Sequence, residues 1–108
     1  MPRFAILAHD WPAPHLDLLL EAGPVLRAWR LLGEPGAAPV PAEPNADHRP
    51  LYLDYEGPVS GGRGAVTRWD AGTFEWVEDG PDRVVVELRG AKLAGRFALD
   101  GTTFGPVP

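Results

Sequence analysis

The chain has 108 residues, of which 44% are hydrophobic and 23% charged, a balance typical of one folded domain with a single core. It contains no cysteine and carries a formal net charge of −5, which excludes disulfides, thiolate metal sites and a cysteine nucleophile and speaks against a strongly basic nucleic-acid-binding surface. No apolar run is long enough for a signal peptide or a membrane span. We therefore expect one cytoplasmic domain, residues 1–108, that does not contact a membrane.

The first predicted elements are short strands. Thirteen glycines and thirteen prolines separate short apolar runs, a pattern typical of strands joined by turns. Residues 3–8 form the first expected strand, which ends before a proline-containing loop because proline lacks an N–H for a ladder. Residues 15–21 alternate in polarity and residues 25–32 follow a turn at Gly23-Pro24, so we predict a β-hairpin. A helix interrupted at Gly23-Pro24 is the alternative for this leucine-rich stretch.

The rest of the chain predicts a loop and then a meander. Residues 33–45 are rich in Pro, Ala and Gly and are expected to form a loop. Residues 51–55 are predicted to be a strand, and residues 57–64 a glycine-rich loop. Further strands are expected at 65–70, 73–78, 83–89 and 92–99, divided by turns at Asp70-Ala71-Gly72, 79–82 and Gly90-Ala91. So many short strands need closure, so we predict an all-β fold: a small closed or nearly closed antiparallel β-barrel with long Pro/Gly-rich loops.

Three side chains near the N-terminus form a predicted metal site. His15 and Asp17 lie on one face of a strand, about 7 Å apart, because a strand rises ~3.3 Å per residue. His9 ends the preceding strand, so a short loop brings it beside them. Two imidazoles and one carboxylate suit manganese, iron(II) or zinc and leave coordination positions open for water or a substrate oxygen.

Other interpretations of these histidines exist. Two histidines and an aspartate also come together by accident on protein surfaces. His15-x-Asp17 with His48 formally matches the facial triad of iron(II) oxygenases, although this arrangement gives His9 no role and offers no clear arginine anchor for an oxo-acid. The four tryptophans are expected to be core or barrel-face aromatics, and only Trp11, beside the predicted site, is a candidate for base stacking.

The chain resembles the 3′-phosphoesterase module of bacterial ligase D. The resemblance covers nearly the whole sequence, with the motifs in the family's order. They are Met1-Pro2-Arg3-Phe4, His9-Asp10, His15-Leu16-Asp17-Leu18-Leu19-Leu20-Glu21, Val25–Trp29, Asp47-His48 with Tyr52, Asp54-Tyr55-Glu56-Gly57, Gly61–Gly64, Trp69–Phe74 and Gly90–Leu99.

The resemblance implies an antiparallel β-barrel that removes a 3′-phosphate, or a 3′-ribonucleotide and then its phosphate, from a DNA primer end during repair. It implies His9, His15 and Asp17 as ligands of a divalent metal, with manganese expected and zinc or cobalt as alternatives. His48 is expected to contact the scissile phosphate or assist the leaving group, and Tyr52 to line the same pocket. Expected partners are the DNA primer 3′ end and a separately encoded ligase or polymerase, and the chain is expected to be a monomer.

The sequence departs from the family at its phosphate-binding positions. The family places an arginine two residues past the aspartate, where this chain has Leu19, and leucine offers no donor to a phosphate. A family lysine shortly after the position of Trp29 is also missing, and a further basic residue has no match in residues 39–45. The arginines considered as replacements are Arg30, Arg49, Arg63 and Arg68, of which Arg63 in its glycine-rich loop is preferred.

Three functional hypotheses therefore remain. Arginines from other strands have taken over the phosphate clamp and the chain is an active phosphoesterase. Alternatively, the chain binds a divalent metal and acts on a different, less anionic ligand. In the third hypothesis it is a non-catalytic binding module.

Overall fold

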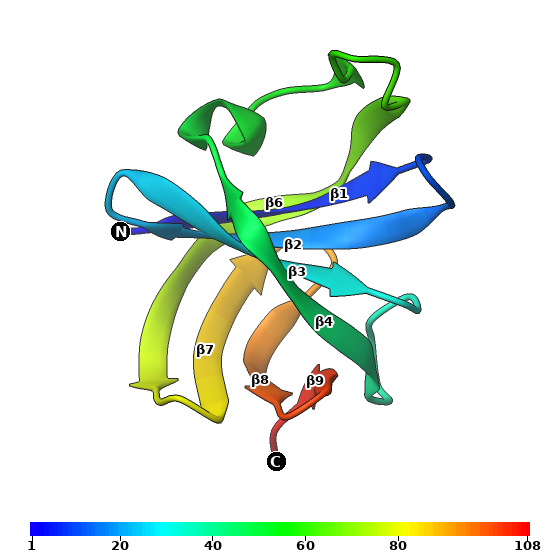
Figure 1. Ribbon diagram of the computed structural model, residues 1–108. Coiled ribbons are helices and arrows are strands. Elements are labelled where there is room, and N and C mark those ends of the chain that lie inside the picture. The colour runs from blue at the N-terminus through cyan, green and yellow to red at the C-terminus, as the bar shows by residue number, and fades with distance from the viewer.

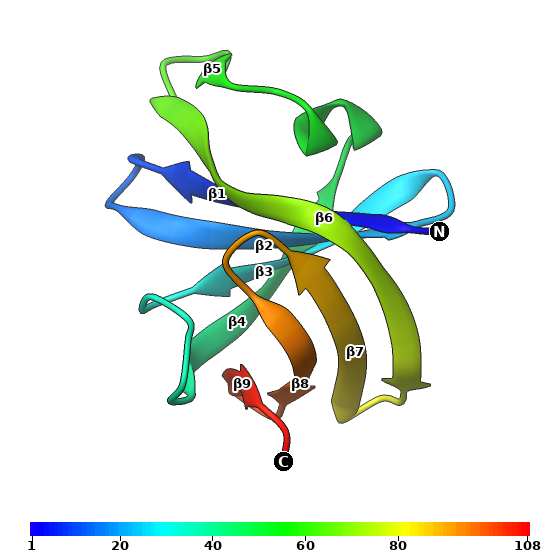
Figure 2. The ribbon, with the colours of Figure 1, turned by 180° about the vertical axis from the view of Figure 1, so that it is seen from behind.

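The computed structural model describes all 108 residues and contains nine strands and one short 3₁₀ helix, η1 (Figures 1 and 2). No helix has the length and apolar character needed to cross a bilayer. The strands are β1 (Arg3–His9), β2 (His15–Ala22), β3 (Val25–Leu31), β4 (Val40–His48), β5 (Gly57–Pro58), β6 (Ala65–Asp79), β7 (Arg83–Gly90), β8 (Ala94–Asp100) and β9 (Thr103–Pro106), and η1 spans Pro50–Leu53.

The strands form one antiparallel sheet that closes into a ring. Its order is β1-β2-β3-β4-β9-β8-β7-β6-β5, and an additional pairing of β1 with β6 closes it. The 15-residue β6 pairs with β1 through its first half and with β7 through its second half, so it runs along the back of the molecule and bends strongly (Figure 2). The predicted all-β, closed antiparallel fold and the β2–β3 hairpin are confirmed.

The sheet buries both of its faces around β1, β2 and β3. Inside the ring lies a cluster of 15 buried residues, including Ile6, Leu18 and Phe74, of which 14 come from eight strands and one, Leu93, from the β7–β8 connection. A second cluster of 7 residues, which we call the outer cluster, covers the opposite face: Ala5, Leu7, Leu19, Leu26, Ala28, Leu53 and Val66. Because side chains alternate along a strand, Leu18 and Leu19 enter different clusters. Burial on both faces explains the continuous run of leucines in β2.

The predicted loop at residues 33–45 is wrong in its second part, because residues from Val40 onward belong to β4. Proline suggested a loop, yet Pro41 still accepts a hydrogen bond from the Leu32 N–H through its carbonyl, at 2.9 Å. β4 pairs with β9 only at Val40 and Pro41, so much of one edge is unpaired. Proline is tolerated on such an edge.

Three further elements differ from the sequence predictions. The strand expected at 51–55 is wrong: Pro50 begins η1, and Leu53 packs into the outer cluster. The strands expected at 65–70 and 73–78 are one strand, so Asp70-Ala71-Gly72 is no turn. Strand β9 was not anticipated.

Asp70 instead organises a turn elsewhere in the sequence. Its buried carboxylate accepts hydrogen bonds from the backbone N–H groups of Ala71, Ala91, Lys92 and Leu93 at 2.8–3.1 Å. Three of these donors lie in the connection between β7 and β8. A negative carboxylate that accepts one buried and three part-buried N–H groups fixes that connection against the middle of β6.

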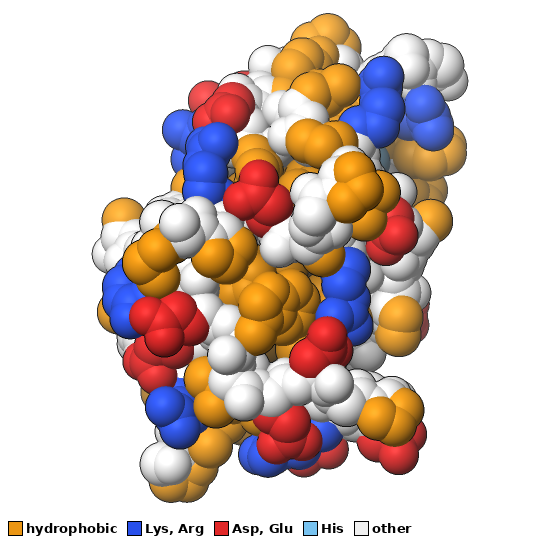
Figure 3. Space-filling view, turned by 90° about the vertical axis from the view of Figure 1, so that its left-hand side faces the viewer, with side chains coloured by type: hydrophobic (Ala, Val, Ile, Leu, Met, Phe, Trp, Pro, Cys, Tyr) orange, Lys and Arg blue, Asp and Glu red, His pale blue; other side chains and the backbone are white.

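Ion pairs occupy much of the surface, and Figure 3 shows side chains of both charges interspersed on one face. Arg3 and Asp54 form a two-pronged pair that ties β1 to the segment after η1. The hydrogen bond from Arg3 lowers the pKa of the Asp54 carboxyl below its usual value, and the positive charge adds to this effect.

We expect this pair to give a small pH dependence. A carboxyl whose pKa is lower in the folded state contributes stability above its unfolded pKa, and this contribution is lost as the pH falls through the lowered value. Arg3→Gln should therefore raise the pKa of Asp54 toward its ordinary value, as followed by NMR titration, and flatten stability at acid pH. An unchanged Asp54 titration in Arg3→Gln would contradict the pairing.

A candidate metal and phosphate site

The antiparallel pairing of β1 with β2 brings the three predicted metal ligands together. His9 and His15 are direct partners in the register, with ring centroids 5.1 Å apart. Nδ1 of His9 lies 3.5 Å from Asp17 Oδ2, and Nε2 of His15 lies 3.2 Å from Asp17 Oδ1. One ligand atom from each of the three residues lies within 4.8 Å of the others. This spacing is compatible with a shared divalent ion.

Backbone carbonyls orient both imidazole rings. Nε2 of His9 lies 2.8 Å from the carbonyl of Arg63, and Nδ1 of His15 lies 2.8 Å from the carbonyl of Ala13. A carbonyl can only accept, so each of these nitrogens donates a proton, and the other nitrogen of each ring faces Asp17. The same support by a carbonyl is typical of histidines that bind metals.

Two atoms of the triad lack a protein hydrogen-bond partner although they are buried. They are His15 Nε2 and Asp17 Oδ1, and Asp17 is only 4% exposed. Buried polar atoms are normally satisfied, and a buried carboxylate especially so. An imidazole lone pair and a carboxylate oxygen facing one point are the donors that a first-row divalent metal takes, so the residues fit such an ion.

The loop that positions His9 depends on Gly64. Gly64 has φ +71°, and a Cβ there would lie 2.1 Å from Asp10 Oδ1 and 2.7 Å from Trp11 Cβ. The absence of a side chain lets Asp10 approach and accept the Ala65 N–H at 2.8 Å. This contact joins the end of β1 to the start of β6 and holds the Arg63 carbonyl beside His9.

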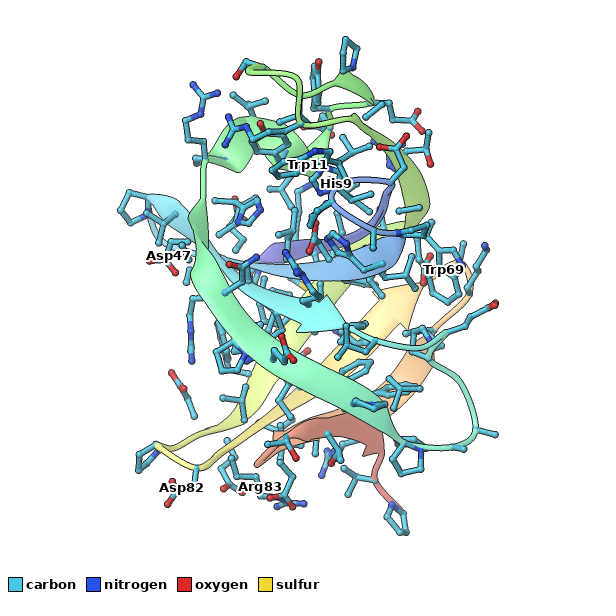
Figure 4. All side chains as sticks on the ribbon, turned by 45° about the vertical axis from the view of Figure 1, so that its right-hand side comes forward. His9, Trp11, Asp47, Trp69, Asp82 and Arg83 are labelled. Atoms are coloured by element: carbon cyan, nitrogen blue, oxygen red, sulfur yellow. The ribbon has the colours of Figure 1, made fainter.

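A pocket of about 340 Å³ opens over the metal triad. The triad lies on its sheet side, and β4 and η1 contribute His48 and Tyr52. The rings of His48 and Tyr52 pack edge-on, with their centroids 5.7 Å apart. His48 Nδ1 lies 2.9 Å from the Ala46 carbonyl oxygen, so Nε2 is the ring nitrogen left for another contact. Figure 4 shows His9 and Trp11 close together beneath η1, with Asp47 on the side of β4.

Of the predicted phosphate-binding arginines, Arg30, Arg49 and Arg63 line this pocket, whereas Arg68 does not. Arg68 lies on β6, where its backbone N–H bonds to Glu56 and its charge acts on Asp54. The other five arginines form ion pairs with carboxylates, whereas these four form none within 4.0 Å. Three of the four unpaired guanidinium groups therefore gather around one pocket of an acidic protein.

The geometry distinguishes the cluster of His9, His15 and Asp17 from the facial triad that would use His48. The cluster of ligand atoms contains His9, His15 and Asp17 and does not include His48, so the geometry does not assemble the facial triad. Sequence reasoning missed Asn45, which lines the pocket from β4, because the prolines around it indicated a loop. It quoted Asp47 only as part of a family motif and gave it no role, although Asp47 also lines the pocket. It also could not find the carbonyls of Ala13 and Arg63, since backbone groups leave no residue signature.

A larger and more apolar pocket, about 580 Å³, lies on the other side of the β1–β2 ends and is lined by Leu16, Leu31 and Trp69. Figure 4 shows Trp69 on the side of the molecule away from Asp47. Lys92 covers the Trp69 ring at 4.4 Å. This pocket shares His9 and His15 with the site, yet three of the four unpaired arginines lie in the smaller pocket and none lines the larger one.

Comparisons with known proteins show the family of the chain. Residues 7–100 match the family model described as the DNA ligase D 3′-phosphoesterase domain. The multifunctional non-homologous end joining DNA repair protein LigD of Mycobacterium tuberculosis (strain H37Rv) is 34% identical over 106 residues, covering 89% of this chain and 14% of that protein. The LigD protein of Mycolicibacterium smegmatis is 32% identical over 114 residues, covering 90% of this chain and 15% of that protein. The chain thus spans about one-seventh of the length of these relatives, and it belongs to the DNA ligase D 3′-phosphoesterase domain family.

Proposed function

We propose that the chain is a divalent-metal-dependent phosphoesterase that removes a 3′-phosphate, or a 3′-ribonucleotide followed by its phosphate, from DNA primer ends. One observation carries the proposal: His15 Nε2 and Asp17 Oδ1 are buried without partners and face the same pocket as three unpaired arginines. A site that combines free metal donors with free cations suits a phosphate ester.

His9, His15 and Asp17 would hold the metal, and manganese is the ion we propose, with zinc or cobalt as substitutes. The metal, when bound, supplies a Lewis acid for a phosphoryl oxygen and lowers the pKa of a water molecule. The Ala13 and Arg63 carbonyls keep the two imidazoles in the tautomer that binds.

His48 and Tyr52 would act on the substrate from the opposite wall. With Nδ1–H donating to the Ala46 carbonyl, His48 in its imidazolium form carries a second proton on Nε2, and this proton can pass to the 3′ oxygen as the P–O bond breaks. Water adds to the phosphorus in the same reaction, so no covalent nucleophile is required. Tyr52 packs edge-on against His48 and restricts its ring.

The acidic net charge of −5 is compatible with a DNA end as substrate because local charge, rather than the sum, attracts a phosphate. Arg30, Arg49 and Arg63 supply that local charge. In the relatives the matching region is a small part of a protein named for several functions, and we propose that a ligase or polymerase completes the repair of ends that this chain prepares. We propose that the chain itself acts as a monomer in the cytoplasm.

The direct test is incubation with a primer-template that ends in a 3′-phosphate, with and without manganese. We expect wild-type protein to release phosphate and His15→Ala to release it at least about 100-fold more slowly, because a ligand of the metal is removed. Release of inorganic phosphate is the readout, and a ligase D phosphoesterase serves as the positive control. No product at a large excess of wild-type enzyme, with the control active, would refute the activity.

A second candidate is a domain that binds metal but does not hydrolyse the primer. Leu19, at the position of a family arginine, favours it. It predicts that manganese raises the melting temperature of wild type and not of Asp17→Ala, since a ligand bound only by the native state stabilises that state, while no phosphate is released. Absence of a manganese-dependent shift in wild type would eliminate both candidates and leave a module that binds no metal.

A further inference from the structure

The register of the β2–β3 hairpin places one arginine beside the metal triad. Asp17 on β2 and Arg30 on β3 are direct partners, and side chains of directly opposed residues point to the same face of a sheet. Arg30 follows Ala28 at a spacing of two, and Ala28 belongs to the outer cluster. The Arg30 side chain therefore leaves the sheet on the side of the pocket, which it lines together with Asp17.

Arg30 has no partner that explains its position. Its Nε is buried and makes no hydrogen bond, one of three such side-chain atoms in the protein, and the other two are His15 Nε2 and Asp17 Oδ1. Arg30 forms no ion pair within 4.0 Å even though Asp17 is its cross-strand neighbour. One buried donor, Arg30 Nε, and two buried metal-ligand atoms, His15 Nε2 and Asp17 Oδ1, thus lack hydrogen bonds in one pocket. This combination indicates a pocket that binds a cation together with an anion.

The other pocket arginines are placed differently. The Arg63 guanidinium is already bonded to its own loop, through Nε to the Ser60 carbonyl at 2.8 Å and through a terminal nitrogen to Ser60 Oγ at 3.3 Å. Arg63 and Arg49 are both exposed. The sequence favoured Arg63 for the phosphate clamp, whereas the free and buried donor belongs to Arg30.

Resting on the proposed function, we propose that Arg30 is the residue that holds the terminal phosphate beside the metal ligands. Arg30 reaches the pocket from β3 and supplies the charge that a leucine at position 19 on β2 lacks. Leu19 is instead buried in the outer cluster, with 0% exposure. The phosphate clamp has moved across the hairpin to the adjacent strand. The exposed Arg49 and Arg63 are then available to contact other phosphates of the DNA strand.

Binding of inorganic phosphate to the manganese-loaded protein tests this assignment without turnover. Titration calorimetry compares wild type, Arg30→Met, Arg30→Lys and Arg63→Met, which removes the competing arginine of the pocket. We expect the dissociation constant of Arg30→Met to be about 30-fold higher than that of wild type, since a hydrogen-bonded charge is lost. Arg63→Met should change it by less than about threefold, and Arg30→Lys should recover part of the affinity because it restores charge without the planar fork. Manganese affinity measured without phosphate should be the same in all four proteins, which shows that the triad is intact.

The assignment is overturned if Arg30→Met keeps wild-type phosphate affinity, if Arg63→Met loses as much, or if wild type binds no phosphate. Should Arg30→Met fail to fold, as judged by circular dichroism, Arg30→Lys decides in its place: affinity equal to wild type contradicts a planar clamp at this position. Failure of the proposed function has a different signature, because phosphate binding that depends on Arg30 without phosphate release from the primer would refute hydrolysis and leave the clamp in place.

Discussion

Replacing Asp70 with alanine should lower the free energy of unfolding by about 4 kcal/mol, because several backbone N–H groups lose a charged acceptor and each unsatisfied buried group costs about 1–3 kcal/mol. The carboxylate is 3% exposed and accepts the N–H groups of Ala91, Lys92 and Leu93 as well as that of Ala71. A loss of this size is a large part of the total stability of a small domain, about 5–15 kcal/mol.

Asp70→Asn is the matched control for this change. Oδ1 receives three of the four hydrogen bonds and Oδ2 receives only that of Leu93, so an amide can keep the larger set and lose one. We expect a loss of about 2 kcal/mol, between wild type and Asp70→Ala. Urea-induced unfolding followed by tryptophan fluorescence measures both. Equal stability of Asp70→Ala and wild type would show that the turn between β7 and β8 does not depend on this carboxylate.

Placing the family's arginine at position 19 should destabilise this protein rather than restore a clamp. Leu19 is fully buried among the apolar side chains of the outer cluster, so an arginine there would place a guanidinium among apolar neighbours, away from water. We expect Leu19→Arg to lower the free energy of unfolding by about 3 kcal/mol, in the range for an uncompensated buried charge. Phosphate affinity of the manganese-loaded protein should not rise.

Leu19→Met separates the effect of charge from that of shape, because methionine conserves volume and such substitutions cost less than about 1.5 kcal/mol. The urea midpoints of the two variants give the comparison. A Leu19→Arg protein as stable as Leu19→Met, with tighter phosphate binding than wild type, would mean that the outer cluster opens readily and that position 19 still reaches the pocket.

The prediction for Leu19 follows from the burial of both faces of the sheet around β1, β2 and β3. The inner face fills the ring, and the outer face is covered by η1, whose Leu53 joins the outer cluster. The same cover, with β4, forms the wall of the pocket that carries His48 and Tyr52. A residue change in the outer cluster therefore affects both stability and the position of the proposed proton donor.

The sequence by itself determined the local parts of the protein. Alternation at period two placed His15 and Asp17 on one face of β2, and the turn at Gly23-Pro24 indicated the hairpin with β3, because these depend on neighbours in the chain. His9 follows from the same local logic, since a short loop joins it to His15 in the β1–β2 register. The family resemblance added His48 and Tyr52, which lie in the same pocket.

Only the tertiary structure decided the features that depend on distant segments. A proline-rich sequence did not indicate that Val40–His48 is a strand, because β4 is stabilised by partners on β3 and β9. Asp70 resembled a turn residue, and its actual role is to bind a turn some twenty residues later. The choice among Arg30, Arg49, Arg63 and Arg68 likewise needed the cross-strand register and the hydrogen bonds of each guanidinium. Composition and spacing fix which side chains are available, whereas long-range packing fixes which of them remain unsatisfied and therefore free to bind a ligand.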